Sequence, residues 1–298
     1  MAYRRLRLAE GFVEYVVDGP EDARHLLIFH SGTPNAAVHW EGLTAAAAAA
    51  GMRVAVYSRG GYGTSPRRQG RTIADEAAIT GALADRLGAD RFFVLGTSGG
   101  GPPALAAAAL LGHRVLACGV AAGLAPRVEA GAAWEAFFNA DALAEWDALA
   151  EWDALEAGRI EPMLDEYRQT IEIFGHMTAS KLRGIGGPPD ARAVAFDHRH
   201  QFIPALVRSM RRAVSSGFYG YLDDNLAQAR DWGFRVSGIR VPVVIRHGAL
   251  DRLVNIAHGR WLAAHIPGAR ATFLDDAGHG SICLPWSDVV SALMDAAK

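Results

Sequence analysis

Short apolar runs and longer amphipathic segments alternate along most of this chain. Two alternating segments, 3–8 and 12–18, predict an N-terminal hairpin that bends near residues 10–11. Further apolar runs have the length of buried strands: 26–29, 54–57, 92–95, 115–120, 241–245 and 271–274. Other segments have helical patterns: 36–50, 73–87, 101–112, 257–266 and 283–297. Strands that alternate with helices predict βαβ units, in which a mostly parallel sheet is covered by helices on both faces.

The alternation stops between residues 126 and 232. This stretch has no strand-like run, is rich in alanine, glutamate and aromatic residues, and contains the helix-breaking sequence Gly-Ile-Gly-Gly-Pro-Pro at 184–189. We therefore expect an α/β core formed by residues 1–125 and 233–298, and a helical cap, or lid, formed by residues 126–232. A cap over the carboxyl ends of the strands would shape a pocket and exclude water.

A short internal repeat lies within the expected cap. The hexapeptide Asp-Ala-Leu-Ala-Glu-Trp occupies 141–146 and again 147–152, and its first three residues recur at 153–155. Large apolar residues then fall at every third position, and on a helix of about 3.6 residues per turn they wind around the axis. Such a helix needs burial on several sides. A tandem duplication without function, a substrate-contacting segment and an assembly surface are the alternatives, and the last predicts a homo-oligomer.

The composition of the chain limits the kinds of molecule that it is expected to bind. The chain of 298 residues has a formal net charge of −2 and no basic stripe, which argues against nucleic acid. Cys118 and Cys283 are too few for a disulfide framework. No apolar secretory segment is visible near the N-terminus, and His113 and Arg114 interrupt the apolar stretch at 102–125, so we expect no membrane span. These features predict a cytoplasmic protein that acts on a small molecule.

The first candidate for chemistry is Ser98. It lies in the sequence Gly-Thr-Ser-Gly-Gly at 96–100, which follows the apolar run at 92–95 and opens an alanine-rich helical segment. A strand, a sharp turn and a helix are the context of a nucleophile elbow, where the serine backbone is strained and its neighbours must be small. The alternative is an ordinary glycine-rich turn, so the interpretation depends on whether partner residues are present.

Asp251 is the candidate acid. A serine hydroxyl needs a base and a group that orients the base, and in elbow proteins the chain order is serine, acid, histidine. Asp251 follows the strand-like run at 241–245 closely, which places a carboxylate at the same sheet edge as Ser98. A helix N-cap or an ion pair with Arg252 are the structural alternatives.

His279 is the candidate base. It lies between two glycines, just after the last strand-like run, on a loop that can reach over the end of the sheet. A purely structural histidine is the alternative. His247, His258 and His265 lie near the same edge, but His265 falls in a predicted helix and His258 follows Asp251 too closely to serve easily.

An oxyanion hole needs two N–H donors aimed at the developing negative charge. Gly99, directly after the serine, is the first expected donor. The second is expected in the loop at 30–35, with Thr33 as the first choice and Gly32 as the second. Pro34 cannot donate, but it would rigidify this loop.

No metal or cofactor is predicted. The histidines of Asp-His-Arg-His at 197–200 could bind a metal, but without further clustering they are more typical of a solvated surface. The glycine clusters at 60–63 and 184–187 match neither the dinucleotide fingerprint nor the P-loop.

Together these segments resemble the α/β-hydrolase superfamily over nearly the whole chain. The matching segments are the loop at 30–34, Tyr-Ser-Arg-Gly-Gly-Tyr-Gly-Thr-Ser at 57–65, the serine turn, the turn at 248–251 and Gly278 with His279. The resemblance implies an α/β fold with a mostly parallel central sheet flanked by helices, an inserted helical cap, and a triad of Ser98, Asp251 and His279. The inserted Ser31 departs from the commonest His-Gly-x-Pro form of the loop.

The same resemblance narrows the expected reaction. Dehalogenases and epoxide hydrolases of the superfamily use an aspartate where this chain has Ser98, and iminopeptidases typically read His-Gly-Gly-Pro-Gly in the loop and tryptophan at the position of Gly99. We expect a serine hydrolase that cleaves an ester or lactone of a small to medium apolar substrate. Amidase, peptidase, thioesterase, carbon–carbon hydrolase and perhydrolase chemistry, or a non-catalytic ligand-binding role, are the alternatives.

The apolar preference is based on aromatic residues of the expected cap. They could line a substrate pocket, and they could equally form the core of the cap. The candidates are Trp134, Phe137, Phe138, Phe174, Phe218, Tyr219 and Tyr221.

Overall fold

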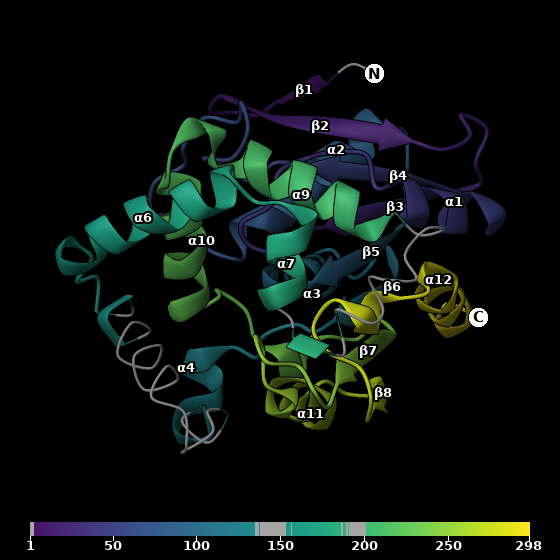
Figure 1. Cartoon of the computed structure of the whole chain (residues 1–298). Helices are drawn as coiled ribbons and strands as arrows, with labels where there is room; N and C mark the ends of the chain where they lie inside the picture. The colour runs from purple at the N-terminus through teal and green to yellow at the C-terminus, as the bar shows by residue number, and fades with distance from the viewer. Residues whose placement is uncertain are drawn as a thin grey trace.

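One twisted sheet organises the molecule (Figure 1). The computed structural model describes residues 3–134, 137, 153–155, 157–185, 187, 188, 190 and 201–298. In these residues eight strands pair in the order β1-β2-β4-β3-β5-β6-β7-β8, and every pair from β4 to β8 is parallel. The strands are β1 Arg4–Arg7, β2 Phe12–Asp18, β3 His25–His30, β4 Met52–Tyr57, β5 Phe92–Thr97, β6 Val115–Ala121, β7 Val243–Gly248 and β8 Arg270–Leu274. This confirms the predicted α/β fold class.

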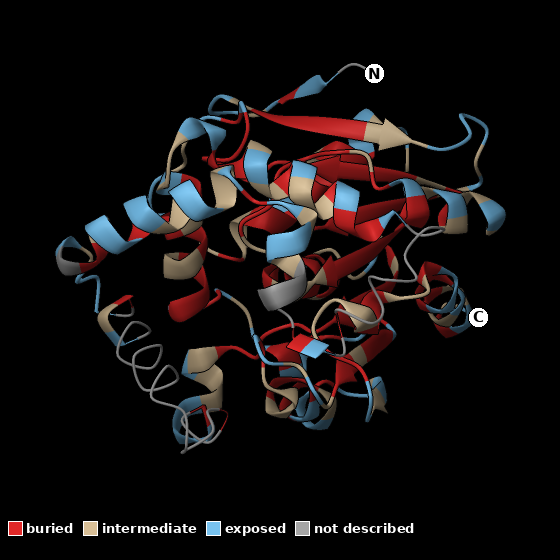
Figure 2. Ribbon diagram, viewed as in Figure 1, coloured by how far each residue is buried: buried red, intermediate tan, exposed pale blue. Residues whose placement is uncertain are grey.

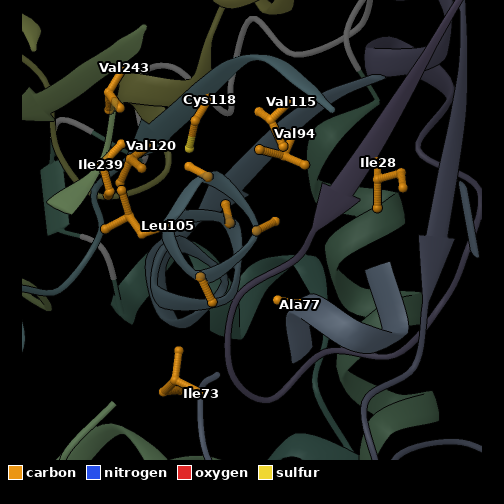
Figure 3. Close-up of a cluster of buried hydrophobic side chains, with 14 of the residues drawn as sticks. Ile28, Ile73, Ala77, Val94, Leu105, Val115, Cys118, Val120, Ile239 and Val243 are labelled. Atoms are coloured by element: carbon orange, nitrogen blue, oxygen red, sulfur yellow. The ribbon is translucent and has the colours of Figure 1, made fainter. Parts of the chain in front are cut away.

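Helices cover both faces of the sheet. One buried cluster joins the sheet to α2, α3 and α11, and a second joins its other face to α1 and α12. Figure 3 shows Val94, Cys118 and Leu105 within the first cluster. Figure 2 shows that the strands are mostly buried, while exposed residues lie on the outer sides of the helices. These helices are α1 Glu41–Ala49, α2 Asp75–Arg86, α3 Gly101–Leu110, α11 Ile256–His265 and α12 Trp286–Ala296.

Two helices begin later than the pattern predicts. The helix expected at 36–50 begins at Glu41, because the preceding segment uses its backbone elsewhere: the Ala37 N–H donates to the Ser58 hydroxyl at 2.8 Å. The last helix begins after Pro285, which has β-region backbone angles at the N-cap. A proline also disfavours helical geometry at the residue before it.

The described residues between β6 and β7 form helices joined by turns and irregular segments, with no strand among them. Its helices are α4 Arg127–Ala130, α6 Leu164–Gly175, α7 Ala179–Ile185, α9 Phe202–Ala213 and α10 Tyr219–Ala229. Both α6 and α7 pack against α9 (Figure 1). The repeat predicted at 141–155 lies outside the described residues except for 153–155, and so do Phe138 and the histidines of 197–200.

Ion pairs with buried carboxylates join this inserted segment to the core. On α9, Arg212 Nη2 lies 2.6 Å from the Oε2 atom of Glu14, a buried residue of β2. On α10, Asp224 pairs with both Arg59 and Arg71, and all three side chains are at most 3% exposed. A buried charge is tolerated only when it is paired, so these contacts fix where α9 and α10 lie on the core.

Candidate active site

Ser98 occupies a sharp turn between β5 and α3. Its φ of +51° lies in the left-handed region, which is uncommon for a serine. A Cβ atom on Gly96 would lie 2.2 Å from the carbonyl oxygen of Gly100, and one on Gly100 would lie 2.0 Å from that of His30. The strand, turn and helix expected around Ser98 are therefore present, and close backbone contacts explain why the flanking residues are glycines.

Asp251 and His279 are hydrogen-bonded at the neighbouring strand ends. His279 Nδ1 lies 2.8 Å from Asp251 Oδ2, and the Asp251 side chain is fully buried. The other carboxylate oxygen, Oδ1, accepts the N–H groups of Leu253 and Val254 at 2.9 Å each. Asp251 is not the helix N-cap considered as an alternative, because the N-cap of α11 is Asn255. Its Oδ1 instead holds the turn before that helix, and this coexists with the histidine contact because each uses a different oxygen.

The surroundings shift both of these groups toward their charged forms. Burial acts to raise the pKa of Asp251, but the charge of His279 and hydrogen bonds from His247, His279 and the Val254 N–H outweigh it and hold that pKa well below its ordinary value. Burial acts to lower the pKa of His279, but Asp251 and then the charge of Asp190 raise it above 6.5. Asp251 is therefore a carboxylate at neutral pH.

Ser98 and His279 face one cavity. The cavity has a volume of about 360 Å³, and its lining also includes Gly99, Thr33 and Gly32. Five of the six predicted site residues thus meet at one surface, and the sixth, Asp251, is bonded to His279. Within the described part of the chain, no hydrogen bond joins the Ser98 hydroxyl to the imidazole.

The cavity walls are mainly apolar. Strand-end residues and the inserted helices both contribute, through Trp40, Leu124, Phe174, Leu182, Phe202, Ile203, Leu206, Met210, Tyr221, Leu253 and Val254. The uncharged polar residues Asn35, Asn225 and Gln228 interrupt this surface, and no lysine or arginine is among the described residues that line it. The carboxylate of Asp190 also lines the cavity, but its Oδ1 atom accepts hydrogen bonds from the loop that carries His279. The cavity therefore suits an uncharged, largely apolar molecule.

The aromatic residues of the inserted segment divide between the two predicted locations. Phe174 and Tyr221 line the cavity. Trp134 and Phe137 instead pack against the buried His258, with ring centroids 4.8 and 4.7 Å from that imidazole. Burial lowers the pKa of His258 to about 3, so the ring is neutral, and its Nδ1 accepts the Ala125 N–H at 3.1 Å. His258 is thus a structural histidine.

The two loops expected to supply oxyanion donors touch each other. A Cβ atom on Gly99 would lie 2.3 Å from Thr33 Oγ1, and one on Gly32 would lie 3.1 Å from Ser98 Cβ. Any side chain at Gly99 would therefore collide with the Thr33 hydroxyl. The serine turn and the loop at 30–35 form one continuous wall.

Arg59 holds the loop at 30–35 in place, a role that the sequence does not reveal. Its guanidinium donates to the carbonyl oxygens of Ser31 and Gly32 at 2.8 and 3.0 Å. Asp224 pairs with Arg59 and also accepts the Thr33 hydroxyl at 2.7 Å. Burial acts to raise the pKa of Asp224, but the charges of two arginines outweigh it and lower that pKa below its ordinary value.

Two further residues hold the Asp251–His279 pair: Asp190 was not predicted from the sequence, and His247 was noted there only because it lies near the same edge. Asp190 Oδ1 accepts the N–H of Gly280 at 3.1 Å and the N–H and hydroxyl of Ser281 at 2.8 Å each. His247 Nε2 lies 2.8 Å from the Val254 carbonyl oxygen and 3.3 Å from Asp251 Oδ2. No local pattern marks Asp190, while His247 had only its position near the carboxyl end of β7 to suggest such a contact.

Two other findings concern the part of the chain that the structure describes. No group of three or more histidine, cysteine, aspartate or glutamate side chains there is arranged to hold a metal ion. No helix there combines the length and the apolar character needed to cross a membrane.

Comparison with known proteins shows a family resemblance over part of the chain. Residues 25–154 match the model of the alpha/beta hydrolase fold family. Over 123 residues the chain is 33% identical to a pimeloyl-[acyl-carrier protein] methyl ester esterase of Aromatoleum aromaticum. That alignment covers 37% of this chain and 43% of the esterase, so it spans less than half of either protein.

Solved structures extend the likeness to the full chain. A hydrolase from Pseudomonas aeruginosa superposes with a TM-score of 0.68 at 20% identity, covering 99% of this chain and 97% of that one. An enol-lactonase from Burkholderia xenovorans gives 0.66 at 20% identity, covering 98% and 99%. An esterase from Exiguobacterium antarcticum gives 0.66 at 18% identity, covering 99% and 98%. At these identities the structures show the fold alone: this chain has the α/β-hydrolase fold, and its residues 25–154 match the model of that family.

Proposed function

We propose that the protein is a serine hydrolase that cleaves an uncharged ester or lactone of small to medium size through an acyl-enzyme. The observation that carries the proposal is the convergence of Ser98 and His279 on one cavity, with the buried Asp251 bonded to the far side of the imidazole. The esterase and the enol-lactonase among the similar proteins act, by their names, on ester bonds, which supports the same class of bond here.

Asp251 sets the protonation of the histidine. A carboxylate can only accept, so its 2.8 Å contact assigns the proton of neutral His279 to Nδ1 and leaves Nε2 with a free lone pair. That lone pair takes the Ser98 proton as the serine oxygen attacks the acyl carbon. The structure shows no hydrogen bond between Ser98 and His279, and this is compatible with the mechanism. Catalytic hydrogen bonds are often long without substrate and shorten when the substrate binds.

The tetrahedral intermediate carries a negatively charged oxygen, which hydrogen-bond donors must stabilise. The N–H groups of Gly99 and Thr33 are the proposed pair, with Gly32 as the second choice for the loop donor. Loss of the alcohol, protonated by His279, leaves the acyl group on Ser98. Water, deprotonated by the same imidazole, then releases the acid.

The helical segment 126–232 is proposed to act as a cap. Its side chains Phe174, Leu206 and Tyr221 line the cavity together with the serine turn. An apolar cover of this kind strengthens hydrogen bonds to the intermediate by excluding water.

Hydrolysis of p-nitrophenyl esters of increasing chain length and of simple lactones tests the proposal. Ser98→Ala should lower kcat by about 10⁴-fold or more, because the nucleophile is lost while binding remains. Ser237→Ala, at an exposed position far along the chain, serves as the matched control and should leave the rate unchanged. Equal rates for wild type and Ser98→Ala would overturn the proposed function.

A further inference from the structure

The inserted helix α10 brings a carboxamide to the corner of the cavity where the oxyanion would form. Gln228 is 4% exposed and lines the cavity together with Ser98, Gly99 and Thr33. Its Nε2 atom lies 3.3 Å from Thr33 Oγ1. A Cβ atom built on Gly99 would lie 3.2 Å from the same nitrogen, so the amide rests directly against Gly99.

The surrounding hydrogen bonds determine which end of this amide faces the site. Asp224 is a carboxylate and can only accept, so the Thr33 hydroxyl proton is donated to it at 2.7 Å. The Thr33 oxygen must then accept from its other partners, which are Arg59 Nη2 at 3.1 Å and Gln228. The NH₂ group of Gln228, and not its carbonyl, therefore points toward Thr33 and Gly99.

One N–H of the Gln228 NH₂ group has no acceptor among the described residues. A carboxamide nitrogen carries two protons, and among the described residues Thr33 alone accepts from it. The backbone of Gln228 is also fixed, because its carbonyl accepts the Trp232 indole N–H at 3.0 Å. The amide is thus fixed in place and has one N–H without an acceptor at the edge of a mainly apolar cavity.

We infer that Gln228 is a third oxyanion donor, a side-chain N–H that α10 adds to the backbone N–H groups of Gly99 and Thr33. The inference rests on the proposed serine mechanism. When Ser98 Oγ bonds to the acyl carbon, its proton passes to His279 Nε2 and the carbonyl π electrons move onto oxygen. The free N–H of Gln228 donates to this O⁻ more strongly than to the neutral carbonyl, so it lowers the barrier rather than tightening substrate binding.

Gln228→Met tests the inference because methionine has similar length and no donor. We expect kcat to fall by about 10²-fold while the KM of a p-nitrophenyl ester changes little. Affinity for an alkyl trifluoromethyl ketone, which forms a tetrahedral adduct with an active serine, should fall by the same factor as kcat/KM. Gln169→Met makes the same chemical change at an exposed site on α6 and should change neither quantity.

A second substitution distinguishes a direct contact of Gln228 with the oxyanion from an effect of Gln228 that acts only through Thr33. Thr33→Val removes the hydroxyl that Gln228 contacts and keeps the Thr33 backbone N–H. If Gln228 touches the oxyanion itself, Gln228→Met must still lower kcat in the Thr33→Val background. If the double variant is no slower than Thr33→Val alone, Gln228 acts through Thr33 and the inference is wrong.

Two controls keep the outcome interpretable. Should Gln228→Met fail to fold, judged by its thermal unfolding curve, Gln228→Asn withdraws the same N–H by one methylene and should show the same loss of kcat. An unchanged kcat in either folded variant overturns the inference. Wild-type protein that neither hydrolyses esters nor reacts with a fluorophosphonate would instead overturn the serine mechanism.

Discussion

Asp190 Oδ1 and the backbone nitrogen of Ser281 lie 2.8 Å apart, which joins the inserted segment to the loop that carries His279. The carboxylate is buried, and its charge is one cause of the raised pKa of His279, after the opposing effect of burial and the larger effect of Asp251. The inserted segment therefore contributes both to the position of the His279 loop and to the pKa of His279.

The pH dependence of kcat/KM should report this charge. His279 must be neutral to accept a proton, so activity rises with pH and the acidic limb should have its midpoint above 6.5. Asp190→Asn keeps an oxygen that can accept the same three hydrogen bonds but removes the negative charge. Since that charge favours the imidazolium, the midpoint should move to lower pH in this variant.

Asp165→Asn is the control for that experiment, because it removes a carboxylate from an exposed position on α6. Its pH profile should coincide with that of wild type. An acidic limb that stays in place in Asp190→Asn would contradict an electrostatic role for Asp190.

Asp251→Asn should lower kcat by about 10⁴-fold with little change in KM. The amide would present either a donor or a weaker acceptor to Nδ1, which destabilises both the required tautomer and the imidazolium. Steady-state kinetics with a p-nitrophenyl ester measure the effect, and a thermal unfolding curve checks that the variant folds. A loss of less than tenfold would mean that Asp251 is only the local cap of its turn.

Gly99→Ala should abolish most activity without unfolding the protein. The added methyl carbon would lie 2.3 Å from Thr33 Oγ1, so the loop at 30–35 must shift away from the serine turn. A displacement of about 1 Å at such a site can cost about 10²-fold in rate. Gly238→Ala provides the comparison, because nothing lies within 4 Å of its added carbon, and it should retain full kcat.

Asp224→Asn should destabilise the fold. It leaves the buried Arg59 and Arg71 without their shared carboxylate, and breaking a buried pair in this way costs about 3–5 kcal/mol. Asp231→Asn removes an exposed partner of Arg235 and should change the free energy of unfolding by less than about 1 kcal/mol. Denaturant titration of both variants measures the difference.

The stabilising effect of Asp224 should also depend on pH. Its folded-state pKa is lowered, so its contribution is complete above the unfolded value near 3.8 and is lost as the pH falls further. The free energy of unfolding of wild type should therefore approach that of Asp224→Asn below about pH 4. A constant difference between the two proteins at every pH would contradict this assignment.

Local pattern was sufficient to predict the sheet and to bring the proposed catalytic residues to one of its edges. Apolar runs predicted the strands, and parallel strands bring their carboxyl ends to one edge, so Ser98, Asp251 and His279 could be placed together without coordinates. The glycines beside Ser98 added a second signal, because they reflect the contact of Gly100 with the His30 carbonyl.

Contacts between the inserted segment and the core could not be predicted in the same way. Asp190, Asp224 and Gln228 stand in stretches with no motif, and each acquires its role from a residue between 90 and 195 positions away. The same is true of Arg59, whose sequence context suggested only a family resemblance. Such pairings depend on how helices pack on the sheet, which hydrophobic periodicity does not specify.

Covalent labelling tests the central claim most directly. Wild-type protein is treated with a fluorophosphonate, and the adduct is located by peptide mass spectrometry while esterase activity is followed in the same sample. The account predicts one adduct per chain, on Ser98, with activity lost in proportion to labelling, and no adduct in Ser98→Ala. Activity that survives complete labelling of Ser98, or inactivation with the adduct on another residue, would contradict it.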